Sequence, residues 1–136
     1  MILLDSTVIV GFLDADDALH EVSVARLREL VGHHSLAASV VSYTEVMTGA
    51  ELGHHPPERV SGFFDALVRD LLPVDRDVAA RASQIRGKRR SLPMPDALIL
   101  ATADLHPEID TVLGADSHWS KLAGLDCSVE LLTAHA

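Results

Sequence analysis

Short runs of apolar residues, each ending at a polar or turn-forming residue, recur at intervals along the chain. Apolar runs bounded in this way are typical of strands buried in a sheet. The first run, Met1 to Leu4, ends at Asp5, and the fourth begins at Thr111 and ends near Asp116. The pattern predicts five strands, at 1–4, 35–39, 72–74, 111–113 and 128–132.

The segments between these runs carry the signals of helices. Apolar and charged positions follow an approximately helical spacing over 19–31, and this segment stops at Gly32. Ser42 and Glu45 have the spacing of a capping box, which would open a helix at Ser42. Prolines, which favour the first turn of a helix, open two further segments. The predicted helices cover 7–13, 19–31, 42–52, 56–71, 75–88 and 95–105.

Strands that alternate with helices, without a long linker or an internal repeat, predict a parallel sheet covered by helices on both faces. The predicted fold class is therefore α/β, a three-layer α/β/α domain with a central parallel sheet of about five strands. A chain of 136 residues can bury a core of its own, so residues 1–136 are expected to form a single domain. In such sheets ligands bind outside the carboxyl ends of the strands.

Composition indicates what the core is made of and in which compartment the chain is expected. Hydrophobic residues make up 48% of it and aromatic residues 4%, which predicts a core of Ala, Val, Leu and Ile. Cys127 is the single cysteine and cannot form an internal disulfide, which fits a reducing compartment. The N-terminal apolar stretch lacks a basic segment and is interrupted by Asp5 and Asp14, so neither a signal peptide nor a membrane span is expected. A cytoplasmic location is the expectation.

Four acidic residues lie at predicted strand ends or in the first turns of the helices beside them: Asp5, Glu45, Asp96 and Asp116. Each alone could be a helix cap or a residue that complements a helix dipole, a contribution of about 0.5 to 1 kcal/mol. A parallel sheet, however, brings its strand-to-helix junctions to one edge, so the four acids should converge there. Capping does not require such convergence, and two carboxylates about 4 Å apart repel by roughly 4 kcal/mol at an effective dielectric of 20.

A cluster of carboxylates needs a counter-ion or a shared proton. Oxygen ligands without Cys or His suit Mg²⁺ or Mn²⁺, and such an ion favours hydrolysis of a phosphodiester. An aspartate-nucleophile phosphatase is an alternative, but its motif has a second Asp where this chain has Thr7. A phosphorylated receiver domain is another, but it requires an acidic pair near the first strand and a Lys late in the sheet, whereas Lys121 lies beyond the fourth strand.

Four segments, "MILLDSTVIVGFLD", "SVVSYTEVMTG", "LPMPDALILATA" and "VLGADSHWSKLAGL", resemble the PIN-domain family, and specifically the VapC-type toxin ribonucleases of bacterial toxin–antitoxin pairs. The resemblance covers nearly the whole chain, with the segments in the expected order. It implies that Asp5 and Asp96 bind magnesium and that Glu45 and Asp116 complete the acidic pocket. It also implies that Ser6 supports this pocket, that water attacks an RNA phosphodiester without a covalent enzyme intermediate, and that translation and growth are inhibited.

The last of these segments departs from the family pattern, in which an acid is followed by a residue pair and Phe. Here Trp119 takes the place of the aromatic residue and is interpreted as a packing residue, and His118 is assigned a packing or supporting role beside Asp116. A non-catalytic PIN module that only binds partners is an alternative from a different functional class. Retention of four mutually repelling acids argues against it.

Four of the eleven basic side chains, Arg86, Lys88, Arg89 and Arg90, stand directly before the Asp96 motif. Cations at the end of a helix can simply complement its dipole. The other interpretation is a patch that binds RNA phosphates beside the acidic pocket, which would reconcile an anionic substrate with a chain of net charge −9.

Other polar residues are predicted to be exposed, among them the histidine pairs at 33–34 and 54–55 and the acid Asp104. The apolar residues of the two helices after the second strand could be plain core, a homodimer face, or a groove for an amphipathic helix. The resemblance implies a VapB-type antitoxin with basic side chains as the occupant of such a groove, and a homodimer. These residues are Val46, Met47, Leu52, Phe63, Phe64 and Leu67.

Overall fold

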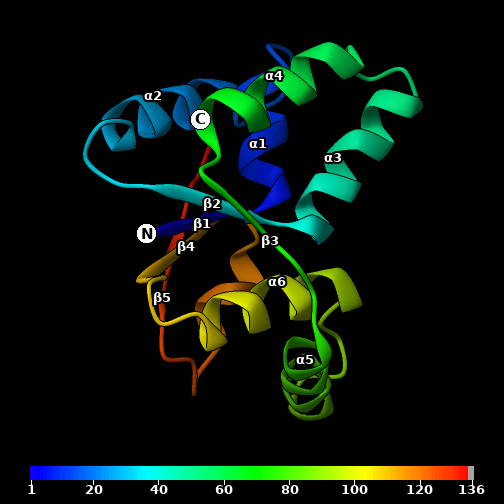
Figure 1. The fold of residues 1–136 in the computed structure, drawn as a ribbon, viewed down its shortest axis with the longest axis vertical. Coiled ribbons are helices and arrows are strands. Elements are labelled where there is room, and N and C mark those ends of the chain that lie inside the picture. Colours follow the sequence, from blue (N-terminus) through cyan, green and yellow to red (C-terminus); the bar gives the residue numbers. More distant parts are fainter. Residues whose placement is uncertain (135–136) are drawn as a thin grey trace.

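Five parallel strands form one sheet in the order β3-β2-β1-β4-β5 (Figure 1). The computed structural model describes residues 1–134, so the last two residues of the predicted domain 1–136 lie outside the described residues. The predicted α/β class with a five-stranded parallel sheet is confirmed. The strands are β1 (Ile2–Leu4), β2 (Leu36–Ser39), β3 (Asp70–Leu72), β4 (Thr111–Gly114) and β5 (Ser128–Leu131).

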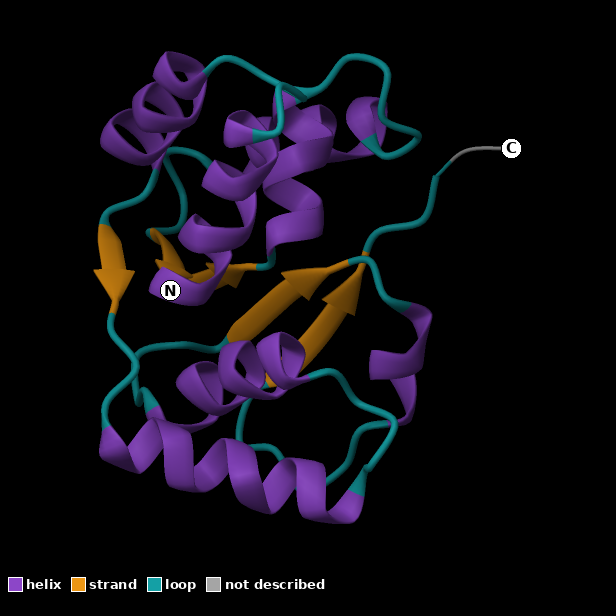
Figure 2. Cartoon of the chain, turned by 90° about the vertical axis from the view of Figure 1, so that its right-hand side faces the viewer, coloured by secondary structure: helices purple, strands orange, loops and turns teal. Residues whose placement is uncertain are grey.

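Helices cover both faces of the sheet (Figures 1 and 2). Each face has a hydrophobic core of its own. Side chains of one strand alternate between them, so that Leu4 packs in the first core and Leu3 in the second. Over residues 1–134, no helix is both long and apolar enough to cross a membrane. The first face carries α1 (Ser6–Leu13), α2 (His20–Leu30), α3 (Val40–Glu51) and α4 (Pro57–Leu67), and the second carries α5 (Arg76–Lys88), α6 (Met94–Leu105) and the 3₁₀ helix η1 (Ser117–Lys121).

The order of the strands places a switch point at the centre of the sheet. The chain starts at β1, moves outward through β2 and β3, and returns through α5 and α6 to β4 on the other side of β1. β1 and β4 are direct neighbours, with Leu4 paired to Leu113. Doubly wound sheets bind ligands at the carboxyl edge of such a switch point.

The helix predicted to begin at Ser42 begins two residues earlier, so its predicted start is wrong. α3 begins at Val40, because Ser39 is its N-cap and accepts a hydrogen bond from the Val41 backbone N–H at 3.0 Å. Ser42 is buried inside the first turn, and its hydroxyl has no hydrogen-bond partner among the described residues. Ser42 and Glu45 therefore do not form a capping box, and the capping explanation for Glu45 falls away.

The predicted third strand lies two residues too late. β3 begins at Asp70, where it pairs with Ala37 of β2, and α4 ends at Leu67 instead of 71. β3 lies at one edge of the sheet, and its middle residue, Leu71, is 45% exposed. Hydrophobicity is a weak guide to the register of a strand that is covered on one side only.

Two polar residues that were predicted to be exposed are buried. His55 is 7% exposed, its Nε2 lies 2.9 Å from the Val46 carbonyl, and its ring closes the turn after α3 against Gly49. The Asp104 side chain is 6% exposed and forms an ion pair with Arg81 Nε at 2.6 Å. In both cases a polar atom of the side chain finds a partner elsewhere in the chain, although His55 Nδ1 has no hydrogen-bond partner among the described residues. Periodicity alone does not reveal such a partner.

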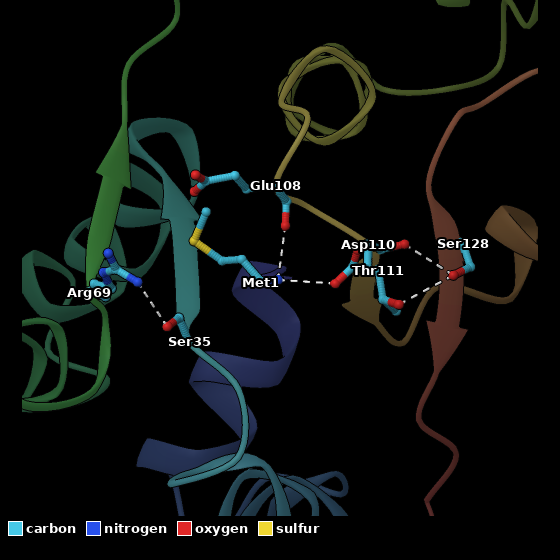
Figure 3. A network of polar contacts seen from close by, with 7 residues as sticks. All are labelled: Met1, Ser35, Arg69, Glu108, Asp110, Thr111 and Ser128. Carbon is cyan, nitrogen blue, oxygen red and sulfur yellow. Dashed lines mark hydrogen bonds and ion pairs between the residues drawn. The ribbon is translucent and has the colours of Figure 1, made fainter.

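Polar groups at the amino edge of the sheet are paired with one another (Figure 3). The Met1 ammonium donates to the Glu108 carbonyl at 2.9 Å and lies 3.1 Å from the Asp110 carboxylate. Arg69 donates to the Ser35 hydroxyl at 3.1 Å. This edge is therefore a set of locally satisfied contacts.

Candidate active site

Asp5 and Asp116 follow the two strands that flank the switch point. Asp5 comes directly after β1, caps α1, and accepts hydrogen bonds from the Thr7 backbone N–H at 3.3 Å and the Thr7 hydroxyl at 2.6 Å. Asp5 is only 4% exposed. Asp116 comes two residues after β4 and caps η1; its Oδ1 accepts from the His118 backbone N–H at 2.9 Å and lies 3.0 Å from His118 Nδ1.

Asp96 and Glu45 reach the same edge from helices. α6 leads into β4, so its N-terminal end, with Asp96 in the first turn, lies at the carboxyl edge of the sheet. The indole N–H of Trp119 donates to Asp96 Oδ2 at 3.1 Å. Glu45 lies in the second turn of α3, and the Ser6 hydroxyl donates to its Oε1 at 3.1 Å.

The carboxylates influence one another electrostatically. Burial is the main cause that raises the pKa of Asp5, and the charge of Asp96 raises it further. Burial likewise raises the pKa of Glu45, with added contributions from Asp5 and Asp96. Burial and then the charge of Asp116 raise the pKa of Asp96. The structure thus brings together all four acids, and their ionised forms oppose one another.

The donor chemistry of this group fits a hard divalent cation. Within residues 1–134, no group of three or more His, Cys, Asp or Glu side chains has the geometry of a metal site as it stands. Mg²⁺, however, keeps several water ligands and is commonly held by only one or two carboxylates together with substrate phosphates. Mutually repelling carboxylates with raised pKa values are the set that such an ion would relieve.

Trp119 does more than pack. Its side chain is 1% exposed, and the ring lies beneath the site while its N–H holds Asp96. Gly114, the last residue of β4, makes room for it, because a Cβ at Gly114 would lie 2.8 Å from the ring. Sequence reasoning missed Gly114 and the hydroxyl of Thr7. A glycine at the end of a buried strand and a Thr two residues after Asp5 were the available signals.

The four cations of the predicted RNA-binding stretch fall into two pairs. Arg86 is half-buried and donates to the Leu92 carbonyl at 2.9 Å. Arg89 is half-buried and donates to the Lys121 carbonyl. Lys88 and Arg90 are exposed and make no hydrogen bond or ion pair within the described part of the chain. These last two are available to a ligand.

The apolar residues after β2 are mostly core. Val46, Phe63 and Phe64 are buried in the first core, whereas Leu52 is 68% exposed. An open apolar groove of about 510 Å³ lies nearby, between α1, α2 and the end of α4. It is lined by Phe12, Val24 and Leu67, among others.

An open parallel sheet with carboxylates gathered at its central switch point defines a class, the three-layer α/β domains that hold an acidic ligand site at the carboxyl edge. Residues 2–125 match the family model described as the PIN domain, and the chain belongs to this family. No curated protein matches the sequence.

Solved structures share the fold. FitAcB from Neisseria gonorrhoeae is 27% identical, with a TM-score of 0.71 over 95% of this chain and 96% of that one. A chain of VapBC2 from Rickettsia felis, bound to a DNA fragment from its promoter, is 13% identical, with a TM-score of 0.74 over 98% of this chain and 100% of that one. VapC20 of Mycobacterium tuberculosis, described as a toxin that cleaves the sarcin-ricin loop, is 19% identical, with a TM-score of 0.72 over 93% and 98%.

Proposed function

We propose that this chain is the toxin of a VapBC-type toxin–antitoxin pair, and that it acts as a magnesium-dependent endoribonuclease that inhibits translation and growth. Mn²⁺ is the alternative ion. The observation that carries the proposal is the gathering of Asp5, Glu45, Asp96 and Asp116 at the switch point of a PIN-domain fold. The solved neighbours add support, because they include proteins described as a VapBC complex and a VapC toxin.

The proposed reaction is hydrolysis. The oxygen of a water molecule forms the new bond to phosphorus, one ester oxygen leaves, and no covalent enzyme intermediate is formed. Asp5 and Asp96 would hold the magnesium ion, with Glu45 and Asp116 completing the pocket. When bound, the ion would supply Lewis-acid stabilisation of the charge on the phosphodiester and an activated water.

The surrounding residues hold these carboxylates in place. The two hydrogen bonds from Thr7 restrict Asp5, and the indole N–H restricts Asp96. Ser6 restricts Glu45 in the same way. Carboxylates held by packing and neighbouring hydrogen bonds need little reorganisation when an ion and a substrate arrive.

A non-catalytic PIN module, or a phosphatase or nuclease unrelated to toxin–antitoxin function, is the competing interpretation. The raised pKa values of three carboxylates count against an inert module, because they mean that these ionised groups oppose folding. A protein that only binds partners has no need of this arrangement.

RNA cleavage by the purified protein tests the proposal. Total RNA would be incubated with the parent and with Asp96→Asn, with Mg²⁺, with Mn²⁺ and with a chelator, and the new RNA ends would be sequenced. Asn can still accept the hydrogen bond from Trp119, so the variant should fold. We expect discrete ends from the parent with a divalent ion and none from Asp96→Asn or with the chelator.

Two results would contradict this function. If the parent produces no new ends with either ion, the chain is not a ribonuclease. If Asp96→Asn cuts at the rate of the parent, cleavage does not pass through the acidic pocket.

A VapB-type antitoxin is the proposed partner. A basic partner suits a chain of net charge −9, and the groove lined by Phe12, Val24 and Leu67 could receive one face of an amphipathic helix. We also propose a cytoplasmic location, a homodimer, and a hetero-oligomer with the antitoxin. Co-expression with the small protein encoded next to this gene, followed by gel filtration, tests the pairing. Separate elution of the two proteins would contradict it.

A further inference from the structure

Two adjoining cavities lead away from the acidic site along α5 and η1. The smaller, of about 270 Å³, is lined by Asp116 and Lys121, among others. The larger, of about 860 Å³, is lined by Lys88 and Arg90, among others. Three residues line both cavities, so the two cavities adjoin, and together they are here called the basic groove. The shared residues are Arg89, Ser91 and Leu122.

The opposite side of the acidic site has the opposite charge. There a cavity of about 270 Å³ is lined by Asp17 and Glu45, together with Ser6 and Thr7 and without a cation. Phosphates of a nucleic acid would be repelled on that side and attracted on the side of the basic groove. A strand whose scissile phosphate lies at the four acids therefore gains charge contacts mainly on one flank.

The cations of the groove divide into structural and available ones. Arg86 and Arg89 donate to backbone carbonyls and so hold the turn between α5 and α6 in shape. Arg81, which also lines the larger cavity, is occupied by Asp104 and by the Gly124 carbonyl. Lys88 and Arg90 have no such partners within residues 1–134 and can bind a phosphate.

The larger cavity suits a whole nucleotide better than a phosphate alone. Its volume lies in the range of pockets that enclose a drug-sized molecule, which is the size of a nucleotide. Ile85, Leu122 and Leu125 give it an apolar floor on which a ribose or base can pack. None of its lining residues is aromatic, so the base would pack without stacking, and little base specificity is expected.

We propose that the larger cavity is a nucleotide subsite for one flank of the RNA substrate. Lys88 and Arg90 bind a backbone phosphate beyond the scissile one, while Arg86 and Arg89 keep the turn in position. The enzyme would then require several nucleotides on one side of the cut and few on the other. This inference rests on the proposed ribonuclease function and adds the polarity of substrate binding to it.

RNA binding can be measured without cleavage. In an Asp96→Asn background, the affinity for a fluorescent single-stranded RNA would be compared for Lys88→Gln, Arg90→Gln and Arg76→Gln. Arg76 is the matched control, because it is exposed at the opposite end of α5 and changes the net charge by the same amount. Each groove variant should weaken binding about two- to fivefold and lower the slope of log K against log salt by about 0.7, whereas Arg76→Gln should do neither.

Steady-state cleavage by the otherwise native enzyme supplies the second readout. A contact made equally in the ground state and the transition state changes KM and leaves kcat alone. Lys88→Gln and Arg90→Gln should therefore raise KM about two- to fivefold, the worth of one exposed charge pair, with kcat unchanged. With substrates shortened from one end, the KM of the parent should rise to that of the variants. Shortening from the other end should leave KM unchanged.

The outcomes separate the two claims. If the parent cuts RNA but the groove variants bind and cut like Arg76→Gln, the subsite is wrong while the ribonuclease stands. If RNA binding is unchanged but the groove variants lose a complex with an acidic protein segment, the surface serves a protein and the subsite is again wrong. If the parent does not cut RNA at all, the proposed function itself fails.

Discussion

At the amino edge of the sheet, Asp110 lies 3.1 Å from an ammonium group (Figure 3), whereas at the carboxyl edge the negative charges of Asp5, Glu45 and Asp96 oppose one another. Among the described residues, no Lys or Arg forms an ion pair with any of these three. The first edge follows the rule that charges find partners. The carboxyl edge violates this rule at these acids, and such local violations are expected at functional sites.

The comparison shows that acidic residues have two different roles in one fold. The paired acid at the amino edge, Asp110, adds a little stability and ties together two segments that are far apart in the sequence. Acids at the carboxyl edge oppose folding when they are ionised. The following substitutions test this contrast by making similar small changes at both edges.

Asp5→Asn should have the largest effect on activity. Asn can cap α1 and accept from Thr7 as Asp does, so the fold should remain, but the charge for the cation is lost. Cleavage of RNA with Mg²⁺ should fall by a factor of about 100 or more, because a bound cation supplies several kcal/mol. The matched control is Asp110→Asn, the same change at the amino edge, which should leave the rate unaltered. Equal rates in the two variants would remove the contrast between the edges.

Gly114→Ala should have the next largest effect. The new methyl group would lie 2.8 Å from the Trp119 ring, which must shift and carry its N–H away from Asp96. We expect a loss of about 1 to 3 kcal/mol in the free energy of unfolding, as for other overpacked sites. We expect kcat to fall by about tenfold, as for a slightly misplaced active-site group.

Gly62→Ala is the control for this glycine. Gly62 lies within α4 with open space around it, and Ala there should stabilise the helix by about 0.5 to 1 kcal/mol. Chemical denaturation and RNA cleavage would be measured for both variants. Unchanged kcat in Gly114→Ala would mean that Trp119 packs beneath the site without positioning Asp96.

The convergence of the acids could be predicted from the sequence because it follows from the topology of a parallel sheet. Asp5 and Asp116 follow buried strands, and any parallel sheet would bring such junctions to one edge. Patterns failed where contacts between distant segments decide the outcome. The burial of Asp104 depends on Arg81, twenty-three positions away, and the start of α3 depends on which of two serines caps it.

The support around the site was also out of reach of the sequence. The Trp119 ring packs against Gly114 and donates to Asp96 only because of where η1 lies. A 3₁₀ helix as short as η1 leaves no helical period in the sequence that could predict this position. In the same way, the stretch 86–90 read as four equivalent cations, whereas backbone carbonyls occupy two of them. Charge can be counted in a sequence, but its availability depends on the folded chain.

Asp96→Asn should raise stability in the presence of a chelator. The pKa of Asp96 is raised above its ordinary value of 3.8, so its stabilising contribution is complete below that pH and is lost as pH rises through the raised pKa. At neutral pH the ionised group therefore lowers the free energy of unfolding. Its removal should add up to about 1 kcal/mol, which is in the range of other charge optimisations.

Urea unfolding at pH 4 and pH 7, with chelator and with Mg²⁺, would measure this effect. The gain from Asp96→Asn should appear at pH 7 with chelator and shrink at pH 4, where the parent becomes protonated. With Mg²⁺ the parent should recover. A variant less stable than the parent at pH 7 with chelator would contradict the opposition among the four acids.

Asp110→Asn should have the smallest effect on stability, which completes the comparison. Its partner is the Met1 ammonium, and the Asp110 side chain is 76% exposed, so water screens the pair. Exposed pairs of this kind contribute about 0 to 1 kcal/mol, and we expect a loss of less than about 0.5 kcal/mol. Urea unfolding in low and high salt would measure it, with the difference from the parent vanishing in high salt. A loss well above 1 kcal/mol would mean that the amino edge depends on its charges as strongly as the carboxyl edge does.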